Sequence, residues 1–166
     1  MIFGVNATKS AVIIAETSGA GQKFAVTSLR PVPFKVDTGD DLKALLQHLT
    51  TLFDGQGKRA EPVLALLKCS SGRFGSGLES IKGEAMVELA AAQLDLRLIK
   101  IAPQSLKKTL GGAADQKWQD RAGELFNPKG KHPNWSRGAA GAVAVAYKVA
   151  AETGFTPSPS DRGESC

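Results

Sequence analysis

Lys68 and Cys69 are the first residues of this sequence whose placement suggests chemistry. They follow an unbroken apolar run at 62–67, which has the pattern of a strand buried on both faces. The carboxyl end of such a strand commonly carries a functional side chain in α/β proteins. Lys68 therefore has two interpretations. Its amine holds a phosphate group, or it is a structural lysine that is buried against a carboxylate or reaches the sheet edge.

Cys69 is a candidate nucleophile because Ser70, Ser71 and Arg73 follow it closely in the sequence. Phosphatase-type loops, however, separate the cysteine from the arginine by more residues than are found here, and no histidine lies nearby to act as a base. An inert thiol is the simpler interpretation. The loop at 70–77 could still bind an anion through its backbone N–H groups, with Arg73 as the charged contact.

Positive charge is concentrated in the second half of the chain. The whole sequence has a formal net charge of +5. Residues 97–148 contain ten Lys or Arg against three Asp or Glu, a balance of about +7. Such a surface suits a polyanionic partner, and nucleic acid is the first candidate. A solvated basic surface without any partner explains the same numbers.

Length and composition indicate a single cytoplasmic domain. The chain has 166 residues, which is enough for one substantial core. No apolar run approaches the roughly 20 residues that span a bilayer, and the first residues lack the features of a secretory signal. The cysteines, Cys69 and Cys166, make a poor disulfide pair, as expected in a reducing compartment. We therefore predict a cytoplasmic protein with no membrane association.

The apolar patterns predict which elements position these residues. Three strands come first, and Pro31 and Pro33 place the third at an edge of the sheet. Helices and strands then alternate, so the order is β-β-β-α-β-α-β-α-α. This order implies an α/β fold with a five-stranded mixed sheet, three antiparallel strands then two parallel ones, and helices on both faces. Its expected elements are strands at 2–6, 10–16, 24–36, 62–69 and 96–101, and helices from 40 to 54, 78–95, 103–110, 115–126 and 136–152. The domain is expected to span 1–153, followed by a disordered tail at 154–166.

Four stretches of the sequence resemble motifs of one family, the RuvC-type Holliday-junction resolvases of the RNase H-like superfamily. They are 4–8, 82–87, 101–111 with Lys117, and 138–146. The chain is also similar to short, uncharacterised bacterial proteins of RNase H-like type. The resemblance covers most of the expected domain and implies the RNase H-like fold.

The resemblance also implies what this chain lacks. The resolvases hold two divalent metal ions with four carboxylates, which activate water for attack on a phosphodiester. The matching positions here are Asn6, Lys68, Gly138 and Gly141. We therefore expect no metal, no cofactor and no resolvase-type catalysis, which makes the protein a pseudo-nuclease.

Gly138 and Gly141 lie one helical turn apart, and each costs stability relative to alanine. We hypothesise that Lys68 or a neighbouring backbone fills the space that the carboxylates left, although drift in an abandoned site explains the glycines equally well.

The resemblance also implies DNA binding and the formation of a homodimer. Basic and apolar positions matching DNA contacts of the family are Arg73, Phe74, Lys107, Lys108 and Lys117. These lysines could equally be solvated, and Phe74 could pack inward. The helix at 78–95 corresponds to the dimerisation helix of the resolvases, which suggests a homodimer. The main prediction is an inactive module that binds branched or duplex DNA.

Two alternatives remain open. One is a protein-interaction or regulatory module with no DNA binding. The other is a metal-dependent nuclease whose site has moved to acidic residues elsewhere in the chain. The candidates for such a site are Asp37, Asp40, Asp41, Glu79 and Glu84.

Overall fold

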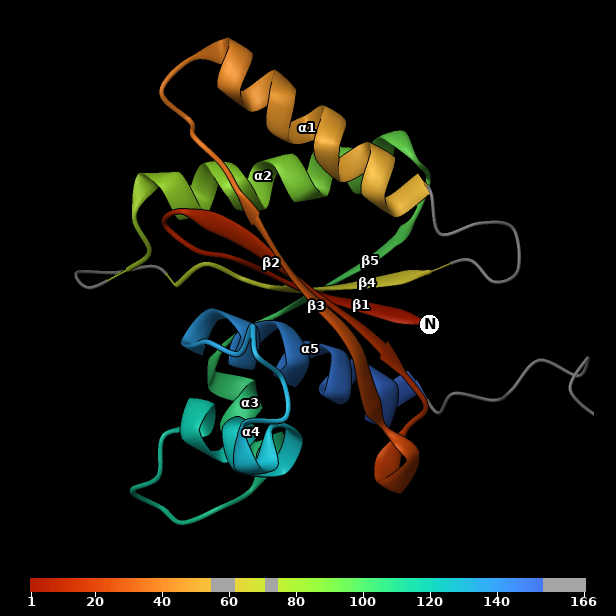
Figure 1. Cartoon of the computed structure of the whole chain (residues 1–166), viewed down its shortest axis with the longest axis vertical. Helices are drawn as coiled ribbons and strands as arrows, with labels where there is room; N and C mark the ends of the chain where they lie inside the picture. The colour runs from red at the N-terminus through yellow and green to blue at the C-terminus, as the bar shows by residue number, and fades with distance from the viewer. Residues whose placement is uncertain (55–61, 71–74, 154–166) are drawn as a thin grey trace, which may run out of the picture.

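The apolar segments at the start of the chain form an antiparallel meander. β1 (Ile2–Ala7) pairs with β2 (Ala11–Ser18), and β2 pairs with β3 (Ala25–Pro33). β4 (Val63–Leu67) then adds parallel to β1, and β5 (Arg97–Ile101) adds parallel to β4. The computed structural model describes residues 1–54, 62–70 and 75–153. Its strand order is β3-β2-β1-β4-β5, which confirms the predicted mixed sheet (Figure 1).

Helices cover both faces of this sheet. α1 (Gly39–Asp54) and α2 (Leu78–Gln93) lie on one face, as Figure 1 shows. The other face carries α5 (Arg137–Thr153), with α3 (Gln104–Leu110) and α4 (Trp118–Phe126) packed beyond it. Short 3-10 turns, η1 (Gly21–Lys23) and η2 (Pro128–Gly130), lie in the connections. None of the helices in the described part of the chain is long and apolar enough to cross a membrane.

The differences from the predicted elements lie mainly at their ends. The helix expected from residue 115 begins at Trp118, because the preceding residues form a turn in which the Gln116 N–H donates to the Ala113 carbonyl at 3.1 Å. β3 is one continuous edge strand through Pro31 and ends at Pro33, so the prolines do not divide it. The predicted edge position is confirmed. The tail predicted at 154–166 lies outside the described residues.

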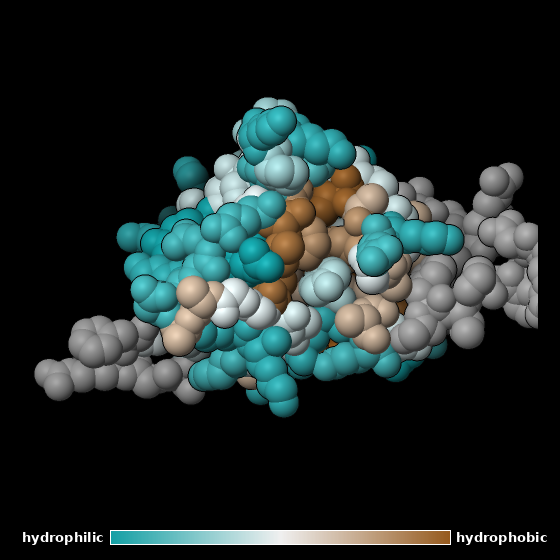
Figure 2. Space-filling view, turned by 90° about the horizontal axis from the view of Figure 1, so that it is seen from below, coloured by the Kyte–Doolittle hydropathy of each residue, from teal (hydrophilic) through white to brown (hydrophobic). Residues whose placement is uncertain are grey.

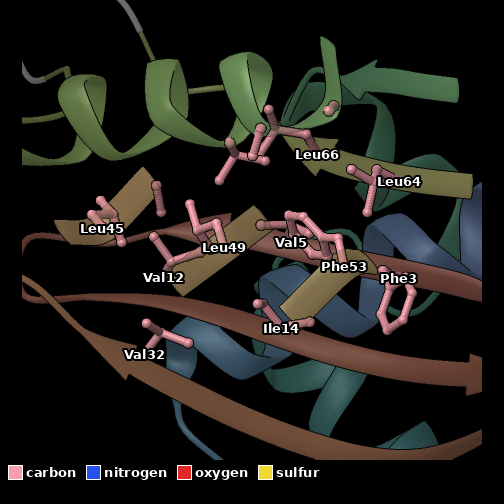
Figure 3. Close-up of a cluster of buried hydrophobic side chains, with 14 residues drawn as sticks. Phe3, Val5, Val12, Ile14, Val32, Leu45, Leu49, Phe53, Leu64 and Leu66 are labelled. Carbon is pink, nitrogen blue, oxygen red and sulfur yellow. The ribbon is translucent and has the colours of Figure 1, made fainter. Parts of the chain in front are cut away.

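The core between the sheet and α1 is built from large side chains. Leu45, Leu49 and Phe53 recur on one face of α1 and are buried against Phe3 and other residues of the strands (Figure 3). The rings of Phe3 and Phe53 lie 5.8 Å apart. This packing confirms the amphipathic pattern of the α1 sequence, and burial of such side chains contributes about 1.5–3 kcal/mol each.

The opposite face of the sheet depends on small residues. α5 is buried along most of its length, and its inward side chains are alanine and valine. Gly4 of β1 allows the close approach, because a Cβ built there would lie 1.8 Å from the Ala142 carbonyl oxygen. α5 can therefore pack directly against β1. This contact determines how close the first turn of α5 lies to the carboxyl ends of the strands.

Changing Gly4→Ala should destabilise the fold by more than about 3 kcal/mol, because the obstructing atom is a helix backbone oxygen that cannot turn aside. The matched control is Gly39→Ala at the start of α1, where a Cβ meets nothing within 4 Å. That change should be neutral or stabilise by up to about 1 kcal/mol. Urea unfolding of both variants measures the difference. Equal stability of the two would contradict the close contact between β1 and α5.

Candidate nucleic-acid interface

A cleft of about 330 Å³ opens where the parallel strands β1 and β4 end. The first turn of α5 and the start of α4 form its other walls. Parallel strands present their carboxyl ends at one edge of the sheet, which is where α/β proteins bind ligands. The cleft is lined by Asn6, Ala7, Thr8, Leu67, Lys68, Cys69, Ser70, Ser76, Pro103, Trp118, Gln119, Arg137 and Gly138.

Asn6 lies between the end of β1 and the backbone of α5. Its Nδ2 donates a hydrogen bond to the Gly138 carbonyl at 3.0 Å. A Cβ built on Gly141 would lie 2.7 Å from the same Nδ2 and 2.9 Å from Leu67 Cδ2. Gly141 is therefore the residue that lets the Asn6 amide reach the helix.

Gly138 has a comparable role one turn earlier in α5. A Cβ there would lie 2.4 Å from Ile13 Cδ1 and 2.9 Å from Thr8 Cγ2. The hypothesis that Lys68 fills the space beside the two glycines is therefore wrong. Side chains of β1, β2 and the end of β4 occupy it, because α5 lies directly against the sheet at this point.

Lys68 lies at the mouth of the cleft. Its backbone N–H continues the sheet by donating to the Ile101 carbonyl at 2.9 Å, while its side chain is exposed. The interpretation of Lys68 as a buried lysine paired with a carboxylate is wrong, since the apolar run ends one residue earlier, at Leu67. Among the described residues, no ion pair involves Lys68.

Arg137 is a cleft residue that the sequence analysis missed. It is the first residue of α5, is exposed and lines the same cleft as Lys68. A signal was present in the sequence, because Arg137 directly precedes Gly138, one of the matched positions. Arg137 and Lys68 are the charged side chains among the described residues that line the cleft.

The buried carboxylate of Glu84, which lies beside the cleft residue Cys69, is already bonded within the domain. Glu84 of α2 is 9% exposed, and its Oε2 accepts the Cys69 backbone N–H at 2.6 Å. Its Oε1 lies 3.0 Å from Lys100 Nζ. Burial alone raises the pKa of Glu84, but the hydrogen bonds from Cys69 and the nearby Lys100 outweigh it and lower the pKa.

Cys69 has the properties of an inert thiol. Burial, followed by its contact with Glu84, raises the pKa of Cys69 to about 11. The nucleophile is the thiolate, so a raised pKa keeps this sulfur protonated and unreactive at neutral pH. The structure therefore agrees with the structural interpretation of Cys69.

The remaining acidic candidates for a relocated metal site lie at helix starts. Asp41 accepts the backbone N–H groups of Asp37 and Thr38 at 3.1 and 3.2 Å, and Thr38 accepts that of Asp41 at 3.2 Å. This reciprocal cap begins α1. Asp40 and Glu79 lie in the first turns of α1 and α2, where the helix dipole favours acids. In the described part of the chain, no group of three His, Cys, Asp or Glu is arranged to hold a metal ion.

The residues predicted to contact DNA have different environments in the structure. The Lys107 amine donates to the Ala114 carbonyl, so it is tied to the loop after α3. Lys108 is exposed on α3, and Lys117 is exposed directly before Trp118, which lines the cleft. Arg73 and Phe74 lie outside the described residues. Of the three predicted lysines, Lys117 is therefore the one that is adjacent in sequence to a residue lining the cleft.

Comparison with known proteins gives the same fold. No family profile and no curated protein matches the sequence. Among solved structures, Thermus thermophilus RuvC in complex with a Holliday junction substrate is similar, with 14% identity and a TM-score of 0.70 over 93% of this chain and 96% of that one. The yeast mitochondrial Holliday junction resolvase has 12% identity and a TM-score of 0.56, over 88% of this chain and 75% of that one.

A fowlpox virus resolvase in complex with Holliday junction DNA is similar at 11% identity, with a TM-score of 0.54 over 89% of this chain and 97% of that one. At such identities the likeness establishes the fold alone. This chain has the RNase H-like fold of the RuvC-type resolvases, as its sequence predicted.

The residues of the cleft do not fit the metal pair that this fold family implies. The Asn6 amide is committed to the Gly138 carbonyl, and the space beside Gly138 and Gly141 is filled by side chains. Lys68 would repel a cation at the mouth. No buried side-chain nitrogen or oxygen of the described residues lacks a hydrogen-bond partner, so none is left over as a ligand.

Replacing Asn6→Asp should destabilise the protein by about 1–3 kcal/mol at pH 7, because a carboxylate would face the Gly138 carbonyl as a second acceptor. The introduced carboxyl should have a raised pKa in the folded state. Relative to the unchanged chain, the variant is then least destabilised below about pH 4, and the difference grows as the pH rises through the folded pKa of the introduced carboxyl. Thermal melts across this pH range measure the effect. A variant that Mg²⁺ restores to the stability of the original chain would show that a metal fits after all.

Proposed function

We propose that this protein binds nucleic acid without divalent metal ions and does not cleave it. The observation that carries the proposal is the cleft at the end of β1 and β4, whose described charged residues are Lys68 and Arg137, both cations. A two-metal nuclease needs carboxylates at this place. A phosphate backbone needs positive charge there, which the cleft supplies.

Branched or duplex DNA is the proposed ligand. The Thermus RuvC and fowlpox structures are complexes with Holliday junctions, and this chain has the same fold. The exposed Lys108 and Lys117 extend positive charge beyond the cleft. Phosphate contacts of this kind supply affinity without reading sequence.

Binding should fall steeply with salt, because phosphate contacts release counterions. Changing Lys117→Glu should weaken binding to a four-way junction and reduce the salt slope by about one. The matched control is Lys43→Glu on α1, exposed on the opposite side of the sheet. Fluorescence anisotropy with junction, duplex and single-stranded DNA measures these values.

The proposal also requires that no strand be cut in Mg²⁺ or Mn²⁺. Cleavage that is lost on changing Glu84→Gln or Asp41→Asn would establish a relocated site instead. Absence of salt-sensitive binding to all three DNAs would remove DNA as the ligand.

A protein-interaction module without DNA binding is the second candidate. Figure 2 shows an apolar hollow framed by hydrophilic side chains on the face that carries α3, α4 and α5. An apolar patch with a polar rim is typical of a protein contact. A protein partner that binds the chain tightly, together with no DNA binding, would favour this function.

A homodimer through α2 is part of the proposal. Leu78, Ile81 and Leu89 are 63%, 48% and 42% exposed, and Ala85 and Ala92 are exposed on the same helix. Gly83, Ala90 and Ala91 of the same helix are buried within the domain, so they lie outside this exposed stripe. The exposed apolar stripe can pair with its own copy across a two-fold axis.

The double change Ile81→Glu and Leu89→Glu should convert the dimer to a monomer, because it places four carboxylates in the paired stripe. Leu125→Glu on α4 is the matched control, since Leu125 is 40% exposed on another helix. Sedimentation equilibrium measures the mass. If the unchanged chain is already a monomer at micromolar concentration, the dimer is wrong.

A further inference from the structure

We infer that Lys68 and Arg137 together form a phosphate-binding site in the cleft, at the place where the fold implies metal ions. The inference rests on the proposed function and specifies how its central site works. One phosphate group, carried by a nucleic-acid backbone or free in solution, is held between the two side chains. The site works without a divalent ion because two fixed cations supply the charge.

Both cations are available for a ligand. Neither Lys68 nor Arg137 takes part in an ion pair among the described residues. Several other basic side chains are committed within the domain. Lys100 pairs with Glu84 and Glu88, Arg121 with Glu124, Lys148 with Glu152, and Lys82 donates to the Val36 carbonyl. The described lining of the cleft therefore brings two cations to one place and includes no carboxylate. Arg137 also borders a neighbouring hollow whose lining includes Asp120 and Glu124, but it forms no ion pair with either of these described residues.

The neutral groups of the cleft do not neutralise that charge. The Thr8 hydroxyl donates to the Ala11 carbonyl at 2.8 Å, and the Ser76 hydroxyl accepts the Ser70 N–H at 3.0 Å. These hydroxyls serve the turns in which they lie. Recognition thus depends on charge, and a phosphate, with up to two negative charges and several acceptor oxygens, suits two cations better than a neutral ligand does.

Arginine and lysine have complementary parts in such a site. The planar guanidinium of Arg137 can bind two phosphate oxygens at once, and the Lys68 ammonium acts as a point charge on a flexible stem. The cleft volume of about 330 Å³ leaves room for the phosphate and for part of a sugar. Trp118, which is half-buried in the wall of the cleft, provides a fluorescent reporter.

The test uses the full chain with the single changes Lys68→Met and Arg137→Met. Two probes are titrated in EDTA: inorganic phosphate, followed by tryptophan fluorescence and phosphorus NMR, and a four-way DNA junction, followed by anisotropy. Lys43→Met is the control, because it removes one exposed charge from α1 on the far side of the sheet. Lys68→Arg and Arg137→Lys test rescue by charge, and circular dichroism melts check that each variant is folded.

Either Met change should weaken binding of the phosphate-bearing probe by about tenfold or more, as expected for loss of a hydrogen bond to a charged group. The control should change it by less than about twofold, and the charge-keeping variants should retain most of the affinity. Loss confined to the junction identifies a backbone phosphate as the ligand. Loss of inorganic phosphate binding in a chain that binds no DNA supports the site and overturns DNA binding as the function.

Two results would overturn the phosphate site. One is that both Met variants bind both probes as the Lys43→Met control does, and retained salt-sensitive junction binding would then leave the proposed function standing. The other is that EDTA abolishes binding and Mg²⁺ restores it, since the charge would then come from a metal ion.

Discussion

The contact between β1 and α5 determines which side chains fit at the carboxyl end of β1. Gly4 lets the Ala142 carbonyl approach the strand, and at the strand end the Asn6 amide bonds the Gly138 carbonyl. A side chain at Gly138 or Gly141 would meet Ile13, Thr8, Asn6 or Leu67, so a metal ligand there would require these side chains to move. The N-terminus of α5 is thus sealed against the sheet, and only the outer part of the site remains as a cleft.

Sealing the site changes its electrostatics. A carboxylate set at this place would neutralise nearby cations, whereas here Lys68 and Arg137 face solvent without an acid among the described lining residues. Their mutual repulsion is modest, because water screens exposed charges. The contrast with Lys100 is informative, since that lysine is paired with the buried Glu84. The domain pairs the lysine that its own structure uses, whereas the two cleft cations are in no ion pair among the described residues.

The sequence predicted the sheet, its edge strand and the helix layers because these follow from local patterns of apolar residues. That Asn6, Lys68, Gly138 and Gly141 stand where the resolvases hold carboxylates came from the resemblance and stays a prediction. The sequence could not show what fills that site, because the contacts of Gly138 with Ile13 and of Gly141 with Leu67 join segments far apart in the chain. Arg137 was missed for a related reason. The sequence does not show that Arg137 and Lys68, which are far apart in the chain, line the same cleft.

The residues at the end of β1 and in the first turns of α5 fit one another closely. The Asn6 amide bonds the carbonyl of residue 138, glycine at 141 leaves it space, and glycine at 138 makes room for Ile13 and Thr8. Gaps or unsatisfied polar groups would be costly in a buried site. The described residues contain no such unsatisfied side-chain group. The glycines of α5 thus give the side chains at the strand ends their packing, and Lys68 and Arg137 lie beside this packed region, in a cleft whose described lining includes no acid.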